Sequence, residues 1–491
     1  MTTVPSQRPE PSRDGGVFLT DVPARLDRLP WSRFHWLVVF ALGVTWIFDG
    51  LEVTLVSSLG AAIKDPRALG LTDAEVGLAS SVYLAGAVLG ALVFGRLTDD
   101  LGRKRLFMVT IGVYFTFTVL TGASWDLWSY ALFRFLTGIG IGGECAAMNS
   151  AVQELIPARR RGYTDLVING SYWLGAGAAA LGSVVLLDQR IFPAGLGWRF
   201  GFLIGGALAL IVIYVRRFLP ESPRWLMTHG RPAEASRIVS AIELKVEKER
   251  GPLPPVGEPI ALVPRTRTGF GEAAAALLRL YPGRSLLSLI LMATQAFCYN
   301  AIFFTYGLIL TKFYGVSSGG VGWFLLPFAL GNFLGPLVLG PLFDRWGRKP
   351  MIGATYALAG VLLALTGWLF KEGVLGAESQ TALWTVIFFF ASAAASAAYL
   401  TIGESFPLET RAMSIALFYA IGTGVGGVAA PAVFGALIGS GSRLEILWGY
   451  LFGGGLMLLA ALAELALGVR AERRPLEEVA PPLSLASRPP A

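Results

Sequence analysis

Two residues of opposite charge, Asp49 and Arg134, lie within long apolar stretches of the 491-residue chain. Asp49 stands about fifteen residues, or roughly 22 Å, into one expected helix, and Arg134 stands about seven residues, or roughly 10 Å, into another that runs the opposite way. In a hydrocarbon core of about 30 Å the two residues reach a similar depth. Charges inside a membrane are costly and usually pair. We therefore predict a salt bridge between Asp49 and Arg134.

Such a pair could also carry protons. A carboxylate beside an arginine has a lowered pKa, and separating the pair in a drier environment raises it, so that a proton is bound and released as the conformation changes. The alternative is a static ion pair that only fixes helix packing. Glu52, one turn further along, and Glu144, on the helix of Arg134, are candidates for auxiliary titrating groups. Interfacial polar contacts are their other interpretation.

Amide and aromatic side chains recur inside the apolar stretches and could line a central cavity. Amides suit hydroxylated solutes, and aromatic faces suit flat organic ones. Each of these side chains could instead serve interhelical hydrogen bonding or an aromatic belt. The candidates for substrate binding are Asn169, Tyr172, Trp173, Gln295, Asn300, Tyr306, Asn332 and Tyr399.

One motif occurs twice in the chain. The segments 95–104 and 340–349 both read G-x-x-x-D-x-x-G-R-K. A second pair follows in the same order, because a Glu, a Pro and an Arg have matching spacing at 154, 157 and 161 and at 404, 407 and 411. Repeated motifs at an offset of about 250 residues indicate an internal duplication, which many transporter folds contain.

The acidic and basic residues of these motifs predict a cytoplasmic gate. The carboxylates can accept hydrogen bonds from backbone N–H groups at helix ends and from the neighbouring arginines. Such bonds would hold the two halves together in one state and break in the other. The alternative is a topology anchor of basic residues near lipid headgroups. The gate candidates are Asp99, Arg103, Glu154, Arg161, Glu221, Asp344, Arg348, Glu404 and Arg411.

The elements that must position these residues are membrane-spanning helices. Apolar runs of about twenty residues are long enough to cross a bilayer, and we expect helices over 34–60, 74–97, 105–123, 127–152, 162–187, 198–219, 285–313, 320–342, 350–370, 380–403, 411–438 and 445–469. The predicted fold is an all-α integral membrane protein with twelve transmembrane helices in two pseudo-symmetric six-helix bundles. The expected divisions are an N-tail (1–33), the first bundle (34–219), a linker with an amphipathic helix (220–284), the second bundle (285–469) and a C-tail (470–491).

The distribution of basic residues predicts the orientation. Of the 40 Lys and Arg residues, 32 lie in the tails and the loops on their side, seven lie in the opposite loops, and Arg134 is the one that this count assigns to a helix interior. By the positive-inside rule we expect both termini and the linker to be cytoplasmic. We also expect the protein to reside in the plasma membrane. The charges of the linker, including its basic amphipathic stretch 232–250, are then expected to form a solvated face.

Composition excludes several other classes of protein. Only 15% of the residues are charged and 54% are hydrophobic, whereas soluble proteins average about 25% charged. The net charge of +7 lies in loops and tails, so nucleic acid is not an expected partner. Two cysteines, both inside expected helices, argue against a disulfide framework or a metal site. Neither a Walker sequence nor a hydrolase motif is present. We expect no cofactor and no catalysis, and energy from a gradient.

At its repeated motifs the sequence resembles the major facilitator superfamily, and within it the sugar-porter-like and metabolite-proton-symporter branches. The similarity runs from about Phe34 to Val469 and includes RFLTG at 134–138 and PESPRW at 220–225. The resemblance implies a pairing of a helix-one Asp with a helix-four Arg. Asp100 departs from the family, which usually has a basic residue there. At the sugar positions only Gln295 and Asn300 of a longer helix-seven pattern are kept, Asn169 replaces Gln, and Tyr399 replaces Trp.

These observations predict a secondary active transporter that works by alternating access. We expect proton-coupled symport of a small organic solute, either a sugar or an organic acid, by a monomer. A facilitative uniporter, a drug or metabolite exporter of the same fold, and a solute sensor without useful flux are the alternatives. The substrate is not specified by any motif.

Overall fold

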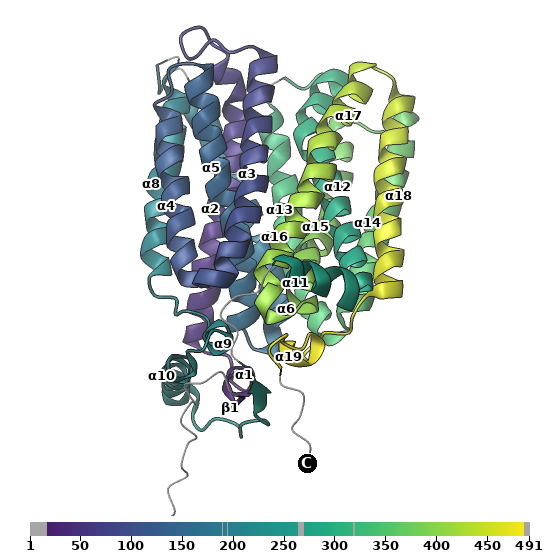
Figure 1. Cartoon of the computed structure of the whole chain (residues 1–491). Coiled ribbons are helices and arrows are strands. Elements are labelled where there is room, and N and C mark those ends of the chain that lie inside the picture. The colour runs from purple at the N-terminus through teal and green to yellow at the C-terminus, as the bar shows by residue number, and fades with distance from the viewer. Residues whose placement is uncertain (1–16, 189, 194, 264–269, 318–319, 486–491) are drawn as a thin grey trace, which may run out of the picture.

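The computed structural model describes residues 17–188, 190–193, 195–263, 270–317 and 320–485. Most of it is helical, and the helices form two bundles that stand side by side (Figure 1). The first bundle contains α2 (Arg33–Ile63), α3 (Asp73–Leu101), α4 (Arg103–Gly122), α5 (Leu127–Leu155), α6 (Arg161–Gly170), α7 (Tyr172–Leu186) and α8 (Gly197–Arg216). The second contains α12 (Pro282–Tyr314), α13 (Val321–Arg345), α14 (Arg348–Lys371), α15 (Ala377–Ser405), α16 (Arg411–Gly422), α17 (Val428–Gly439) and α18 (Arg443–Leu467).

Two of the expected continuous helices are broken. Among the described residues, ten helices are long and apolar enough to cross a membrane, and α6 with α7 and α16 with α17 make the other two crossings. The expected helix 162–187 breaks at Ser171, whose Oγ donates to the carbonyl of Ile168 at 2.6 Å. The expected helix 411–438 contains a π-helical turn, Thr423–Gly427. With these crossings the fold is the predicted twelve-helix fold of two six-helix bundles.

Glycine explains the sharp turn at each copy of the repeated motif. Gly102 separates α3 from α4 with a φ of +95°, and Gly347 separates α13 from α14 with a φ of +106°. Residues with a Cβ atom rarely adopt a positive φ of this size. Because the chain reverses there, Arg103 returns to Asp99 on the preceding helix, and the corresponding arginine returns to Asp344.

Parts of both tails and of the linker form a structured layer at one end of the bundles (Figure 1). This end, which we call the tail face, carries α1 (Val22–Asp27), α9 (Pro223–Thr228), α10 (Pro232–Arg250) and α19 (Leu476–Val479). Strand β1 (Phe18–Thr20) of the N-tail pairs antiparallel with β2 (Ile260–Leu262) of the linker, and Leu262 also pairs with Leu485. A short helix, α11 (Phe270–Ala275), leads into α12.

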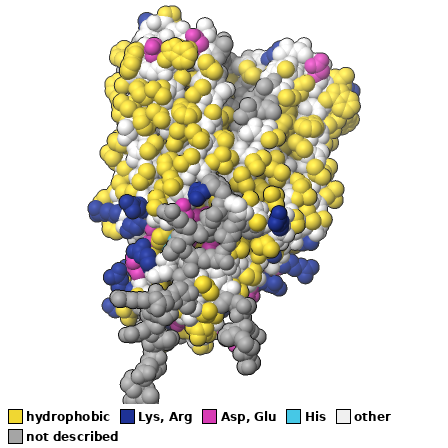
Figure 2. All heavy atoms as spheres, viewed as in Figure 1, with side chains coloured by type: hydrophobic (Ala, Val, Ile, Leu, Met, Phe, Trp, Pro, Cys, Tyr) yellow, Lys and Arg dark blue, Asp and Glu magenta, His cyan; other side chains and the backbone are white. Residues whose placement is uncertain are grey.

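The linker is therefore not only a solvated face, as the sequence had suggested. Glu243 on α10 accepts hydrogen bonds from Arg25 and, at 2.6 Å, from Arg28. The apolar side of α10, including Val239 and Val246, is buried. Figure 2 shows hydrophobic side chains over the bundles and Lys and Arg side chains gathered near the tail face. This is the pattern of a protein that places its middle in lipid.

Candidate transport cavity

A cavity of about 290 Å³ lies between the two halves. Its wall comes from α2, α3, α5, α6 and α7 of the first half and from α12, α15, α16 and the π-helical turn of the second half. Six of the eight residues that the sequence suggested for substrate binding are in this wall: Asn169, Tyr172, Trp173, Gln295, Asn300 and Tyr399. The predicted residues therefore include wall residues from both halves.

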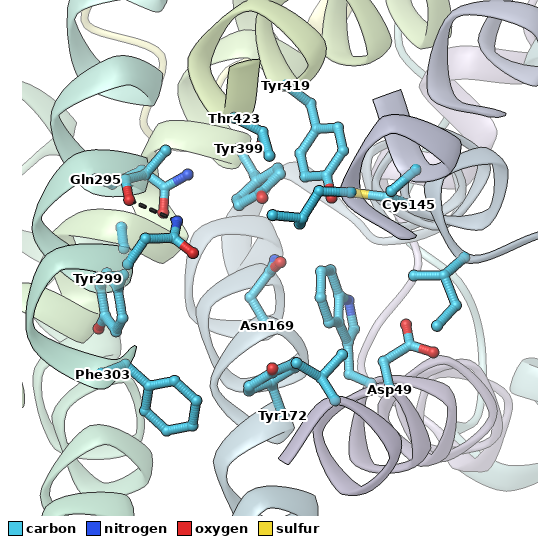
Figure 3. Close-up of a pocket in the computed structure, with 18 of the residues that line it drawn as sticks. Asp49, Cys145, Asn169, Tyr172, Gln295, Tyr299, Phe303, Tyr399, Tyr419 and Thr423 are labelled. Atoms are coloured by element: carbon cyan, nitrogen blue, oxygen red, sulfur yellow. Dashed lines mark hydrogen bonds between the residues drawn. The ribbon is translucent and has the colours of Figure 1, made fainter. Parts of the chain in front are cut away.

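The α12 wall follows helical periodicity. Gln295, Tyr299 and Phe303 are spaced four residues apart, so they lie on one side of the helix, and all three line the cavity. In Figure 3 they stand opposite Asp49, with Asn169 and Tyr172 between the two sides. Asn300 lines the cavity next to them and donates from Nδ2 to the carbonyl of Ala296 at 2.6 Å. The helix therefore presents amides and aromatic rings together.

Tyr306 and Asn332 do not line the cavity, contrary to the expectation from sequence. The hydroxyl of Tyr306 lies 2.9 Å both from the carbonyl of Phe324 and from Oγ1 of Thr381, so its polar end is already used within the second half. Asn332 is fully buried, and its Oδ1 accepts a hydrogen bond from the Tyr299 hydroxyl at 2.8 Å. Asn332 thus orients a cavity side chain from behind.

Several residues of the cavity wall were not among those predicted from the sequence. They share a spacing of four residues in otherwise apolar helical segments, which was the available signal: Ser392 with Ser396 on α15, and Tyr419 on α16 with Thr423 in the π-helical turn that follows. Trp46 was overlooked as one aromatic residue among many. Its ring centroid lies 6.2 Å from those of both Tyr172 and Tyr399, which belong to opposite halves. Aromatic rings from both halves therefore face the same space.

Arg134 pairs with Glu52 and not with Asp49, so the predicted partner was wrong. The guanidinium contacts the Glu52 carboxylate and lies 4.1 Å from the ring centroid of Tyr83. Both charged side chains are almost fully buried. Glu52 follows Asp49 by three residues, so it lies about 4.5 Å further along the helix. Depths counted from expected helix ends could not resolve one helical turn.

Asp49 is buried and lines the cavity, and its carboxylate points toward the interior (Figure 3). It forms no ion pair within the part of the chain that the structure describes. Its electrostatic neighbours are Glu144, Arg216 and Glu52. Asp49 thus stands at the cavity wall, between two ion pairs formed by other residues.

The second of these ion pairs joins Glu144 to Arg216 at 2.6 Å. Arg216, in the last turn of α8, also donates to Oγ1 of Thr45 at 2.6 Å. The charge count had assigned Arg216 to a loop, and Arg134 had been the one basic residue in a helix interior. That assignment was wrong, because the Arg216 side chain is buried between helices. Neither Glu144 nor Glu52 lines the cavity.

The two copies of the repeated motif form equivalent ion clusters at the tail face. In the first half Arg103 contacts Asp99 at 3.2 Å and Glu154 at 2.7 Å. In the second half Arg348 makes the equivalent contacts, to Asp344 at 2.7 Å and to Glu404 at 3.0 Å. All six side chains are buried.

Each cluster also reaches into the opposite half. Asp344 accepts the backbone N–H groups of Gly162 at 3.2 Å and Tyr163 at 2.9 Å, at the start of α6. Asp99 accepts the N–H of Met413 at 3.0 Å, at the start of α16. The arginines of the second repeated pair also contact the opposite half. Arg161 lies 3.7 Å from Glu404, and Arg411 lies 3.5 Å from Glu154. The halves are therefore joined at the tail face by two symmetric sets of contacts.

Glu221 has a different position from the other gate candidates. Its carboxylate accepts the backbone N–H of Arg103 at 2.9 Å, so it caps α4 within the first half. Burial raises the pKa of Glu221 above its ordinary value, although these backbone hydrogen bonds oppose the shift. Asp27 of the N-tail was not among the candidates. It contacts Arg224 at 2.7 Å and Arg161 at 3.2 Å, which links the N-tail to the same network.

Within the described residues, no group of three or more His, Cys, Asp or Glu side chains is arranged to hold a metal ion. Cys145 and Cys298 are both buried with free thiols. The cavity therefore offers aromatic, amide and charged side chains as its means of binding.

Comparison with known proteins agrees with this architecture. The model of the family described as "Sugar (and other) transporter" matches residues 43–481. The putative metabolite transport protein YyaJ of Bacillus subtilis (strain 168) is 33% identical over 354 residues, which cover 70% of this chain and 74% of YyaJ. The niacin transporter NiaP of Acinetobacter baylyi is 29% identical over 418 residues (84% and 89%). The 4-hydroxybenzoate transporter PcaK of the same species is 26% identical over 424 residues (86% and 87%).

A solved structure shares the fold. The proton:xylose symporter XylE of the major facilitator superfamily superimposes with a TM-score of 0.73 at 17% sequence identity, covering 90% of this chain and 98% of XylE. The family match spans most of the chain and includes both halves, the cavity and the two ion clusters. The chain therefore belongs to the sugar (and other) transporter family of the major facilitator superfamily, and it is a multi-pass membrane transporter and not an enzyme.

Proposed function

We propose that this transporter imports a small, flat organic acid together with a proton, by alternating access. The observation that carries the proposal is the composition of the cavity wall. Aromatic rings from both halves surround it, and three amides lie among them: Asn169, Gln295 and Asn300. Rings bind a flat apolar body, while amide N–H groups and tyrosine hydroxyls can donate to a carboxylate. Relatives whose names specify niacin and 4-hydroxybenzoate support this class of substrate.

The charge of the wall supports proton coupling. Arg134 is neutralised by Glu52, so Asp49 is left as a carboxyl group that faces the cavity without an ion-pair partner of its own. An anionic substrate that enters a low-dielectric cavity beside an ionised Asp49 is repelled. A proton on Asp49 removes that repulsion. Substrate and proton then bind together, which is the condition for symport.

The contacts between halves support alternating access. We propose that residues 34–219 and 285–469 move as two bundles, and that the crossed ion clusters close the tail face while the cavity serves the other side. We further propose that the tail face is cytoplasmic, that the linker 220–284 and both tails lie there, that the protein resides in the plasma membrane, and that the monomer is the working unit. The excess of Lys and Arg near the tail face supports this orientation.

A sugar is the second candidate substrate. Gln295 and Asn300 are both in the wall, and amides are suited to hydroxyl groups. The two candidates differ in what the aromatic rings must do. A flat acid needs the face of a ring against its own ring, whereas a pyranose is held mainly by hydrogen bonds.

Uptake into proteoliposomes separates the alternatives. Purified full-length protein is tested with radiolabelled 4-hydroxybenzoate, nicotinate and D-xylose, with and without an inward pH gradient and a protonophore. We expect gradient-driven accumulation of an aromatic acid, lost in Tyr172→Ala and kept in the matched control Tyr172→Phe. Accumulation of xylose alone would overturn the choice of acid. Uptake at the same rate with and without the pH gradient would identify a uniporter. Thermal stabilisation of the protein by a ligand that it does not transport would identify a sensor.

A further inference from the structure

Asp165 on α6 is a fully buried carboxyl group that the transport cavity does not contain and the ion clusters do not use. It forms no ion pair within the residues that the structure describes. A buried carboxylate without a cation is costly, and the cost disappears when the group binds a proton. Burial therefore favours the protonated form of Asp165. A proton-binding site also needs surroundings that can hydrogen-bond to both the carboxylate and the protonated acid.

The hydrogen-bond partners of Asp165 serve both forms. Nε2 of Gln153 donates to Oδ1 of Asp165 at 2.9 Å. Nδ2 of Asn169 donates to the backbone carbonyl of Asp165 at 2.9 Å and lies 3.3 Å from its Oδ2 and from Oδ1 of Asn149. These bonds suit a carboxylate. Oε1 of Gln153 is buried and has no partner within the described structure. A rotation of this amide by half a turn would bring an acceptor to Asp165, which suits the protonated acid.

Asp165 lies between the cavity and the tail face. Asn169, which bonds to it, lines the cavity, and Oδ1 of Asn169 has no partner in the described chain. On the other side Arg161, one turn earlier on α6, reaches the second ion cluster through Glu404. Asp165 is therefore connected to the cavity through the side chain of Asn169, and it lies one helical turn from Arg161, which contacts the second ion cluster.

The charged groups around Asp165 come from that tail-face side. Glu404 on α15, Arg348 on α14 and Arg161 on α6 itself act on it electrostatically. Of the other helices packed against α6, α13 brings Asp344 to its first turn, and α5 carries Glu154 directly after Gln153. Helix α7 has no ionisable side chain apart from Tyr172. Residues 36–48 of α2 include none at all. An opening of the tail face would move Glu404 and Arg348 relative to α6 and so would change the electrostatic field at Asp165.

The internal repeat separates this group from the packing of the fold. The gate residues recur in the second half at an offset of 250 residues, as Glu154 with Glu404 and Arg161 with Arg411. At the same offset Asp165 corresponds to Ile415, Gln153 to Gly403, and Asn169 to Tyr419. The polar set is therefore present in one half only. Six-helix packing of this kind does not require it.

We propose that Asp165 is a second proton-binding site, which takes up a proton from the cavity side and gives it to the tail side. In the step, an O–H bond forms on an Asp165 oxygen with a proton delivered through the cavity, and the same bond breaks to water once the tail face has opened. No group changes its oxidation state in this step. The proposal extends the proton-coupled symport proposed above and rests on it for its role in transport, but proton binding at Asp165 can be measured independently.

The first test measures proton binding directly. Purified full-length protein is titrated with acid and followed by infrared difference spectroscopy, which detects the carbonyl stretch of each carboxylic acid as it forms. We expect a band in the wild type that is absent from Asp165→Asn, an isosteric variant that keeps the amide contacts. The matched control is Thr164→Val, a change of similar shape at the adjacent buried residue. Identical titrations of the wild type and Asp165→Asn would overturn the proposal.

The second test measures the effect on transport. Counterflow of 4-hydroxybenzoate in proteoliposomes is followed at a series of pH values that are equal on both sides. We expect one limb of the wild-type pH profile to be lost in Asp165→Asn and kept in Thr164→Val. An unchanged profile in Asp165→Asn would refute its role in coupling. If wild-type protein carries neither 4-hydroxybenzoate nor nicotinate, the proposed substrate class is refuted, and the infrared titration alone decides for or against Asp165.

Discussion

Asp344 of α13 accepts a hydrogen bond from the backbone N–H of Tyr163 at 2.9 Å, although the two residues belong to opposite halves of the molecule. Asp99 makes the equivalent bond to Met413 at 3.0 Å. In both cases a carboxylate lies at the start of a helix, where free N–H groups and the helix dipole favour a negative charge. The contacts that join the two halves at the tail face therefore depend on the charge of two residues.

We predict that Asp344→Asn opens the tail face more often. The change replaces a charge-assisted hydrogen bond, worth about 1.5–3 kcal/mol, by a neutral one. A loss of about 1.4 kcal/mol already shifts a two-state equilibrium tenfold. The readout is the rate at which a maleimide labels Leu166→Cys in a variant without other cysteines, because Leu166 is fully buried on α6. We expect the labelling rate to rise in Asp344→Asn and in Asp99→Asn.

The control for this experiment is Asp100→Asn. Asp100 stands next to Asp99 but lies 3.7 Å from Arg96 on the same helix, so its charge does not join the halves. In Asp100→Asn, the labelling rate of Leu166→Cys should equal the rate measured when Asp99, Asp100 and Asp344 are all unchanged. An equal rise in the control would assign the effect to the loss of any acidic residue near the helix end. No rise in either variant would leave the motifs as topology anchors.

The pair of Glu52 with Arg134 gives a prediction about stability. Glu52→Gln leaves a buried guanidinium without its counter-ion, and breaking a buried pair from one side costs about 3–5 kcal/mol. We expect a clearly lower midpoint of thermal unfolding. The double variant Glu52→Gln with Arg134→Met removes both charges and should regain much of the loss. Glu378→Gln, at an exposed position, is the control and should unfold like the wild type. Equal midpoints for Glu52→Gln and the control would contradict the pairing.

The docking of the N-tail on α10 should depend on pH. Burial raises the pKa of Glu243, but hydrogen bonds from Arg25 and Arg28 and their charges outweigh it, so that the pKa is lower than usual. A lowered carboxyl pKa contributes stability that is complete above the ordinary value of 4.5 and is lost as the pH falls through the lower, folded value. We expect hydrogen exchange of residues 18–28, corrected for intrinsic rates, to increase in acid.

Glu243→Gln tests the same contact at neutral pH. It should give residues 18–28 the fast exchange that the wild type shows only in acid. Glu247→Gln, exposed on the same helix, is the matched control and should exchange like the wild type. Slow exchange of the N-tail in Glu243→Gln would show that the other contacts, which are the pairing of β1 with β2 and the ion pairs of Asp27, hold the N-tail in place.

The proposed orientation predicts the labelling of two exposed positions. Arg237 lies on α10 at the tail face, and Ser440 follows α17 at the opposite end. In intact cells an impermeant maleimide should label Ser440→Cys but not Arg237→Cys, whereas lysed cells should give labelling of both. Labelling of Arg237→Cys alone in intact cells would reverse the topology.

Hydropathy and the repeated motifs were sufficient to predict the crossings and the two ion clusters, because these features depend on residue type and spacing along the chain. The partner of Arg134 was not predictable in the same way. Asp49 and Glu52 differ by less than one helical turn, and the choice between them depends on the rotation of α2 against α5. Sequence periodicity does not determine this rotation when several faces of a helix are apolar.

Long-range polar contacts were also beyond the sequence. Arg216 was counted with the loops because it stands near a helix end, yet it reaches inward to Glu144. Asp27 lies in a polar tail, and its contacts with Arg224 and Arg161 join segments that are far apart in the chain. Tyr306 was placed in the cavity because its type and depth suit a binding site, but its hydroxyl points to α15. Residue type alone did not indicate which face of α12 each side chain occupies.

The last prediction concerns Asp49→Asn. Asn has the shape of a protonated Asp and similar hydrogen-bonding groups, but it has no proton to release. We expect the variant to keep counterflow of an aromatic acid in proteoliposomes and to lose accumulation driven by a pH gradient. Its stability should stay close to that of the wild type, because Arg134 keeps Glu52 as its counter-ion. In this respect the variant should differ from Glu52→Gln.

The comparison of the two variants decides between coupling and structure. If Asp49 carries the coupled proton, Asp49→Asn separates counterflow from accumulation at nearly unchanged thermal stability. If Asp49 serves only helix packing, both activities fall together and the unfolding midpoint falls with them. Accumulation that survives in Asp49→Asn would remove Asp49 as the coupling site. Glu144, which is buried beside it and paired with Arg216, would then be the next carboxyl group to test with the same two assays.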